Sequence, residues 1–250
     1  MKRILCFFSI LSLILASCSS NVESAVNAEN VLLPMTEKYT NASYPEDSST
    51  VTYAYDGNKI TSLTYDNGSA VVFTYTGNLI TKAVYTETYE GTTHTSTTTF
   101  TYENDKLKST LKVNSGNSLH KKRTYSYNAD GTISTITLLI NPQTLEETED
   151  SSSILTLDVN GNIIKQESDG FTTVVEYDTK NSPFKSILGY SSLLDSDVFD
   201  QDANSSNNLT KVTDISGDGS QDINTYVNTY NSDNYLTKSV NGSETKEYTY

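Results

Sequence analysis

A short sequence pattern returns along most of the chain and constrains the fold more than any other feature. In TYAYDGNKITSLTY, from Thr52 to Tyr65, two alternating apolar and polar runs are separated by Asp-Gly-Asn. Period-two alternation of Thr, Val and aromatic residues is typical of strands, and Gly and Asn accept the positive φ angles of tight hairpin turns. Each copy of this pattern therefore predicts one β-hairpin.

Similar units follow, most of them spaced by about 20 to 30 residues, and each begins with an arm that ends in an anchor residue. The anchors are Tyr55, Tyr75, Tyr102, Tyr127, Leu157, Tyr177 and Tyr230, and a last arm ends at Tyr250. The pattern predicts that NSPFKSIL forms the returning arm after Tyr177, and that a degenerate unit lies around Asn207 to Asp214. A period of this size indicates one supersecondary element per repeat.

The two ends of the repeat carry complementary half units. LLPMTEKYTN resembles a second arm without its first, and TKEYTY resembles a first arm without its second. We therefore expect the terminal strands to pair. The predicted fold is all-β, an antiparallel meander of about 16 to 18 short strands that rolls into a closed or nearly closed barrel. An open, strongly curved sheet is the alternative. The anchor tyrosines are expected to face one buried side, opposite a Thr-rich face.

The first residues predict an export signal. Lys2 and Arg3 precede an apolar run from Ile4 to Ala16, which is too short for a membrane-spanning helix of about 20 residues. The following LASC resembles a bacterial lipobox, and this resemblance implies cleavage before Cys18 and lipidation of its thiol. An ordinary secretory signal is the alternative. The expected organisation is a signal peptide over residues 1–17, a flexible tether over 18–30 and one β domain over 31–250.

Composition excludes some partners. The chain has 17 Lys and Arg residues against 31 Asp and Glu residues, a formal charge of −14. Such a chain repels phosphate backbones, so we expect no nucleic-acid partner. Cys6 would leave with the signal peptide, so no disulfide is expected in the processed chain.

The units YDGNKIT, YNADGTI and DVNGNIIK resemble the Tyr-Asp (YD, or RHS-type) repeat. The whole layout is similar to that of uncharacterised lipoproteins of Gram-negative bacteria, of the Bacteroidetes type, that have a porin-like fold. The resemblance runs from about Leu32 to Tyr250. It implies an outer-membrane location through an N-terminal lipid such as palmitate, on either the periplasmic face or the cell surface.

One stretch matches the spacing of a calcium loop. Oxygen-bearing residues stand at positions 1, 3, 5, 7 and 9 of DISGDGSQD, with Gly219 at position 6. These residues are Asp214, Ser216, Asp218, Ser220 and Asp222. Thr225 stands at position 12, where a calcium loop has Glu, so a plain hairpin turn is the alternative.

The sequence shows no arrangement typical of catalysis, and we expect no enzyme. The only histidines, His94 and His120, lie in polar stretches without a neighbouring Cys or second His. The prediction is a non-catalytic, lipid-anchored envelope protein that binds a glycan, a peptide or an envelope partner, or serves as a structural component. The alternative is an enzyme or carrier that uses a barrel lumen, and a more remote one is an outer-membrane pore.

Overall fold

The computed structural model describes residues 31–116, 119–194 and 205–250. The predicted signal peptide, the tether and Cys18 lie outside these residues. The described chain contains seventeen strand segments and two short 3-10 helices. The first half of the chain holds β1 (Thr36–Asn41), η1 (Pro45–Asp47), β2 (Ser49–Asp56), β3 (Lys59–Tyr65), β4 (Ala70–Thr76), β5 (Leu79–Tyr89), β6 (Thr92–Glu103), β7 (Lys106–Asn114) and β8 (His120–Tyr127). The second half holds β9 (Ile133–Ile140), β10 (Glu147–Leu157), β11 (Ile163–Ser168), β12 (Phe171–Tyr177), η2 (Tyr190–Ser192), β13 (Leu209–Ser216), β14 (Gln221–Thr225), β15 (Val227–Tyr230), β16 (Leu236–Asn241) and β17 (Glu244–Thr249).

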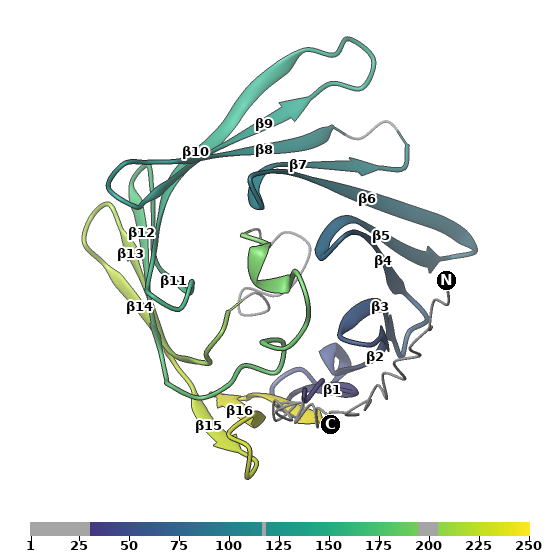
Figure 1. Cartoon of the computed structure of the whole chain (residues 1–250), viewed down its shortest axis with the longest axis vertical. Helices are drawn as coiled ribbons and strands as arrows, with labels where there is room; N and C mark the ends of the chain where they lie inside the picture. The colour runs from purple at the N-terminus through teal and green to yellow at the C-terminus, as the bar shows by residue number, and fades with distance from the viewer. Residues whose placement is uncertain (1–30, 117–118, 195–204) are drawn as a thin grey trace, which may run out of the picture. The chain divides into compact units, whose positions relative to one another are not determined.

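Consecutive strands pair antiparallel around a ring, as the hairpin repeat predicts (Figure 1). The terminal strands β1 and β17 pair with each other, with Thr36 opposite Thr249, and this confirms the pairing expected from the two half units. Only Tyr226 separates β14, which pairs with β13, from β15, which pairs with β16. These two segments therefore belong to one strand path, which gives an even number of paths, as an antiparallel ring requires. The all-β, nearly closed barrel is confirmed.

The anchor residues occupy a special position in the strands. The pairing register shifts beside six of them, at the end of each first arm. These are Tyr55, Tyr75, Tyr102, Leu157, Tyr177 and Tyr230. A β-bulge bends and twists its strand, so a bulge in nearly every hairpin helps the sheet to curl into a barrel.

Several anchor tyrosines also connect neighbouring hairpins. The hydroxyl of Tyr102 donates a hydrogen bond to the carbonyl of Ile80 at 2.7 Å, and that of Tyr127 donates to Leu107 at 3.1 Å. Tyr250 donates to Leu236 at 2.6 Å. In each pair the acceptor begins the returning arm of an earlier hairpin, so the repeated Tyr stabilises the packing between repeats. Five anchor rings pack against the core but are only partly buried, which is less than expected: Tyr55, Tyr75, Tyr102, Tyr230 and Tyr250. Tyr127 is 39% exposed.

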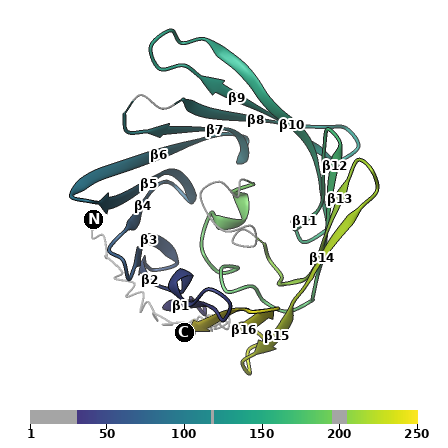
Figure 2. The ribbon, with the colours of Figure 1, turned by 180° about the vertical axis from the view of Figure 1, so that it is seen from behind.

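The chain leaves the barrel wall after Tyr177, where the repeat predicted another returning arm. Residues 178–194 and 205–208, called the inner segment below, lie inside the ring of strands in both views (Figures 1 and 2). The expectation of a strand in NSPFKSIL is therefore wrong. Phe184, Ile187 and Leu193 of this stretch are buried in the core, because their apolar side chains fill the lumen instead of alternating along a wall.

The inner segment is held by specific contacts with the barrel wall. The ring of Phe184 packs against Tyr53 of β2 and Tyr248 of β17, with ring centroids 5.8 and 6.0 Å apart, and against Tyr190 of the inner segment itself at 5.5 Å. The N–H of Leu188 donates to the carbonyl of Asn58 at 2.9 Å. These contacts make the half of the lumen beside β2 to β5 a packed apolar core.

Candidate functional site

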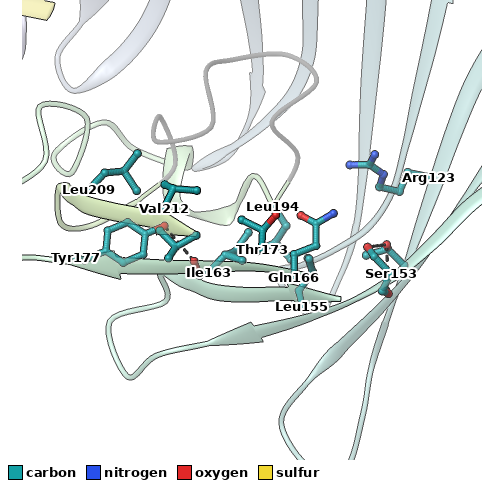
Figure 3. A pocket seen from close by; sticks show the side chains of 12 residues that line it. Arg123, Ser153, Leu155, Ile163, Gln166, Thr173, Tyr177, Leu194, Leu209 and Val212 are labelled. Atoms are coloured by element: carbon teal, nitrogen blue, oxygen red, sulfur yellow. Dashed lines mark hydrogen bonds between the residues drawn. The ribbon is translucent and has the colours of Figure 1, made fainter. Parts of the chain in front are cut away.

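A cavity of about 140 Å³ lies in the other half of the lumen (Figure 3). Its wall comes from β8 to β13, and Leu194 of the inner segment contributes to it. Arg123, Thr135, Ser153, Gln166 and Thr173 supply its polar side chains. Apolar side chains also line it, including Leu155, Ile163 and Val212.

The strand register explains why polar residues gather there. Residues directly opposite each other in an antiparallel pair have side chains on the same face of the sheet. Gln166 lies opposite Thr173, and Thr173 lies opposite Asp214, so these three side chains continue across three strands on the inner face. Arg123 shares that face because it stands two residues before the buried Tyr125 in β8.

Hydrogen bonds fix much of this polar lining. The Nε of Arg123 donates to Thr137 Oγ1 at 3.1 Å, and Thr137 is only 2% exposed. The hydroxyls of Thr135 and Ser153 lie 2.7 Å apart. Such bonds orient the side chains before any ligand arrives, which lowers the entropy lost on binding.

The far end of the cavity is stabilised by the anchor Tyr177. Its hydroxyl donates to the carbonyl of Ile163 at 3.1 Å and accepts from Ser205 Oγ at 3.3 Å. Nearby, the hydroxyl of Tyr230 donates to the carboxylate of Asp178, where the inner segment begins. Burial raises the pKa of Tyr230, and the hydrogen bond to the Asp178 carboxylate raises it further, so this hydroxyl stays protonated at neutral pH.

The polar groups that line the cavity are a guanidinium, an amide and hydroxyls, and these can donate hydrogen bonds to a ligand and accept them from it. His94 lies opposite Glu87 in the β5–β6 hairpin. His120 is the first residue of β8, and two residues separate it from Arg123. Within residues 31–116, 119–194 and 205–250, no group of three His, Cys, Asp or Glu side chains could hold a metal ion.

The predicted calcium stretch forms the β13–β14 hairpin. The N–H of Ser216 donates to Ser220 O at 3.0 Å and the N–H of Gly219 donates to Ser216 O at 2.8 Å, which closes a tight turn. Asp218 Oδ1 accepts from the backbone N–H and the hydroxyl of Ser220, and these bonds lower the pKa of Asp218. Asp214 and Asp222 lie opposite each other in the ladder. The structure thus brings two of the five residues together on one face and places the others at the turn, and calcium binding stays a prediction.

Sequence reasoning missed Arg123. The signal was present in HKKRTYSY, because the phase that places Tyr125 inside also places Arg123 inside. HKKRTYSY resembles a basic run exposed to solvent only if the alternation of its side chains between the two faces of the strand is ignored.

No known family model matches this chain, and no curated protein matches it in sequence. Solved structures match its fold. A porin-like protein from Bacteroides vulgatus superposes with a TM-score of 0.56 at 10% sequence identity, over 88% of this chain and 98% of that one. A porin-like protein from Bacteroides uniformis gives a TM-score of 0.47 at 14% identity, over 86% of this chain and 97% of that one. The barrel is therefore shared with the Bacteroides vulgatus protein. In the described part of the chain, no helix has the length and apolar character needed to cross a membrane.

Proposed function

We propose that this chain is a non-catalytic, lipid-anchored protein of the cell envelope that binds a glycan, a peptide or another envelope component in its luminal cavity. The observation that supports it is the division of the lumen. One half is packed with the inner segment, and the other half keeps a small cavity with oriented polar side chains. A protein with a purely structural role would gain stability from filling this space as well.

The proposed cellular location comes from the sequence. Lipidation of Cys18 would attach the barrel to the outer membrane, and the tether over residues 18–30 would separate the two. The likeness in fold to a protein described as porin-like supports an envelope location.

The outer wall of the barrel carries charged side chains, and these favour a location in water. Exposed ion pairs join Lys122 to Glu147, Lys165 to Glu167, and Lys211 to Glu176 on this wall, at 3.2, 2.7 and 3.0 Å. A charged side chain on the lipid face of a membrane barrel costs about 2 to 4 kcal/mol at the bilayer midplane. Several such charges argue against the pore alternative.

An enzyme that uses the lumen is the second candidate, and one observation favours it. Asp214 and Asp222 form a pair of neighbouring carboxylates on the inner face, and paired carboxylates are the usual catalytic groups of glycosidases. If they are catalytic, Asp222→Asn abolishes turnover of a glycan substrate and leaves binding of that substrate intact.

The binding proposal is tested by capture of envelope glycans and peptides with the chain from Val31 onwards. A Val212→Trp variant fills the cavity, and an Ile223→Trp variant serves as its control because Ile223 is 51% exposed. We expect Val212→Trp to abolish capture of at least one component and Ile223→Trp to retain it. Equal capture by both variants would place binding elsewhere and refute the proposal.

A further inference from the structure

An exposed phenylalanine lies on the inner face of the barrel beside the cavity. Three alternate residues of β12, Thr173, Val175 and Tyr177, line the cavity, so their side chains point inward. Phe171 stands two residues before Thr173, and its ring therefore leaves the same face just beyond the cavity. It is 43% exposed, whereas the other phenylalanines among residues 31–116, 119–194 and 205–250 are at most 7% exposed. The inner face thus presents a flat aromatic ring to solvent.

Polar side chains lie next to this ring on the same face. Gln166, Thr173 and Asp214 follow one another across β11, β12 and β13, and Asp222 of β14 lies opposite Asp214. The hydroxyl of Thr173 donates to Oδ1 of Asp214 at 2.6 Å. Gln166 and Asp222 are exposed, and no described residue forms a hydrogen bond with the amide of the first or the carboxylate of the second. An amide and a carboxylate are therefore available to a ligand beside the ring.

The backbone at Phe171 is held by its neighbours on both sides. The two ladders of β12 continue as far as Phe171, which lies opposite Ser168 and Ser216. The preceding Gly170 packs against the β13–β14 turn, because a Cβ at Gly217 would lie only 3.1 Å from the carbonyl oxygen of Gly170. The ring is thus carried by a paired strand, and such preorganisation lowers the entropy lost on binding.

We propose that this part of the inner face binds a neutral glycan. It is called the platform below and consists of Gln166, Phe171, Thr173, Asp214 and Asp222. This inference rests on the proposed binding function and specifies its ligand class. The C–H face of a sugar ring can pack on the flat ring of Phe171, which removes apolar area of both from water. Sugar hydroxyls donate to carboxylate oxygens and accept from the Gln166 amide, and hydrogen bonds to an ionised group are among the stronger ones.

The same groups disfavour two other classes of ligand. Asp214 and Asp222 lie opposite each other, so an acidic sugar placed on the platform would meet like charge. An extended peptide binds a sheet by pairing with the backbone of a free edge. The platform offers a face instead of an edge, because β12 and β13 are each paired on both sides.

The width of the platform indicates how long the glycan is. Gln166 in β11 and Asp222 in β14 are three strand spacings apart, which is about 14 Å across the sheet. This width exceeds that of a single sugar ring. We therefore expect a chain of sugar units to bind more tightly than one unit.

The test is calorimetric titration of the full-length chain, purified in a detergent without a sugar headgroup. The neutral probes are cellotriose, maltotriose, mannotriose and chitotriose. Glucose serves as the single unit and trigalacturonate as the acidic counterpart. We expect at least one neutral trisaccharide to bind at least tenfold more tightly than either glucose or trigalacturonate.

Variants assign this binding to the platform. Phe171→Ala should weaken it at least tenfold, and Phe171→Tyr, which keeps a flat ring, should retain it. Gln166→Ala and Asp222→Ala should each weaken it at least threefold. Ile223→Ala is the matched control, because Ile223 is 51% exposed and follows Asp222 in β14, so its side chain lies on the outer face. This control should change the affinity less than twofold, and thermal unfolding checks the fold of each variant.

Failure of all four neutral trisaccharides to bind, or equal losses in Phe171→Ala and Ile223→Ala, would overturn the platform. Equal or tighter binding of trigalacturonate would overturn the neutral ligand class. Capture of envelope components by the parent protein but not by Val212→Trp decides separately whether the cavity binds anything. The binding function can therefore stand when the platform fails.

Discussion

Removing one hydroxyl at Tyr75 tests how the repeat holds the inner segment in place. The Tyr75 hydroxyl accepts a hydrogen bond from the N–H of Ile60 at 3.2 Å and donates one to the carbonyl of Leu188 at 3.0 Å. It thus connects a neighbouring hairpin with the inner segment. Tyr75→Phe keeps the ring and leaves both backbone groups without this partner. At about 1 kcal/mol for each lost bond, the free energy of unfolding should fall by about 2 kcal/mol.

Two other Tyr→Phe variants calibrate this value. Tyr102→Phe loses a single bond, to Ile80 O, and should lose about 1 kcal/mol. Tyr89 is 67% exposed, and Tyr89→Phe should change stability by less than about 0.5 kcal/mol. Urea unfolding followed by far-UV circular dichroism measures all three in the chain from Val31, which forms one compact unit. Equal losses at Tyr75 and Tyr89, or no loss at Tyr75, would refute the bridging role.

Four further predictions concern Gly189, the pH dependence at Tyr75, Cys18 and the DISGDGSQD turn. Gly189→Ala should destabilise the fold by more than Gly77→Ala. Both glycines have positive φ, but only a Cβ at position 189 would lie 2.6 Å from a backbone oxygen, that of Asn78. Equal losses in urea unfolding would contradict this prediction. Burial raises the pKa of Tyr75 to about 12, so its contribution to stability is complete below about pH 10 and is lost as pH rises toward 12; urea midpoints between pH 9 and 12 should fall less steeply in Tyr75→Phe. Cys18→Ala should block incorporation of labelled palmitate and release the protein from membranes, and unchanged detergent partitioning would refute the anchor. If DISGDGSQD binds calcium, Asp218→Ala should abolish the heat of calcium titration. Absence of heat in the parent protein would show that the stretch forms only a turn.

The barrel could be predicted from the sequence because the information is local and repeated. Alternating residues define each arm, Gly and Asn define each turn, and the half units at the ends specify how the ring closes. The register shifts beside the anchors could not be predicted. A bulge depends on how a strand pairs with its neighbours, and the alternation of residues within one arm carries no information on that pairing.

The inner segment was missed for a physical reason. NSPFKSIL follows an anchor Tyr and contains apolar residues, so it resembles a returning arm. Pro183, however, lacks the backbone N–H that a central strand donates to its neighbour, and this should have counted against a strand. The cavity depends on where this segment lies, so neither its position nor its lining could be predicted from the repeat alone.

The position of the inner segment within the barrel is the central structural claim, and an engineered disulfide tests it most directly. Asn58 and Leu188 are joined by a backbone hydrogen bond of 2.9 Å, and residues 31–250 contain no cysteine. Asn58→Cys/Leu188→Cys, made in the chain from Val31, should therefore form an intramolecular disulfide on mild oxidation. Asn58→Cys/Thr144→Cys, whose second position lies in the β9–β10 connection, should not. Thiol titration and the shift in unreduced electrophoresis report the result. A disulfide in the first pair alone is the predicted outcome, and free thiols in both pairs would contradict the packed half of the lumen.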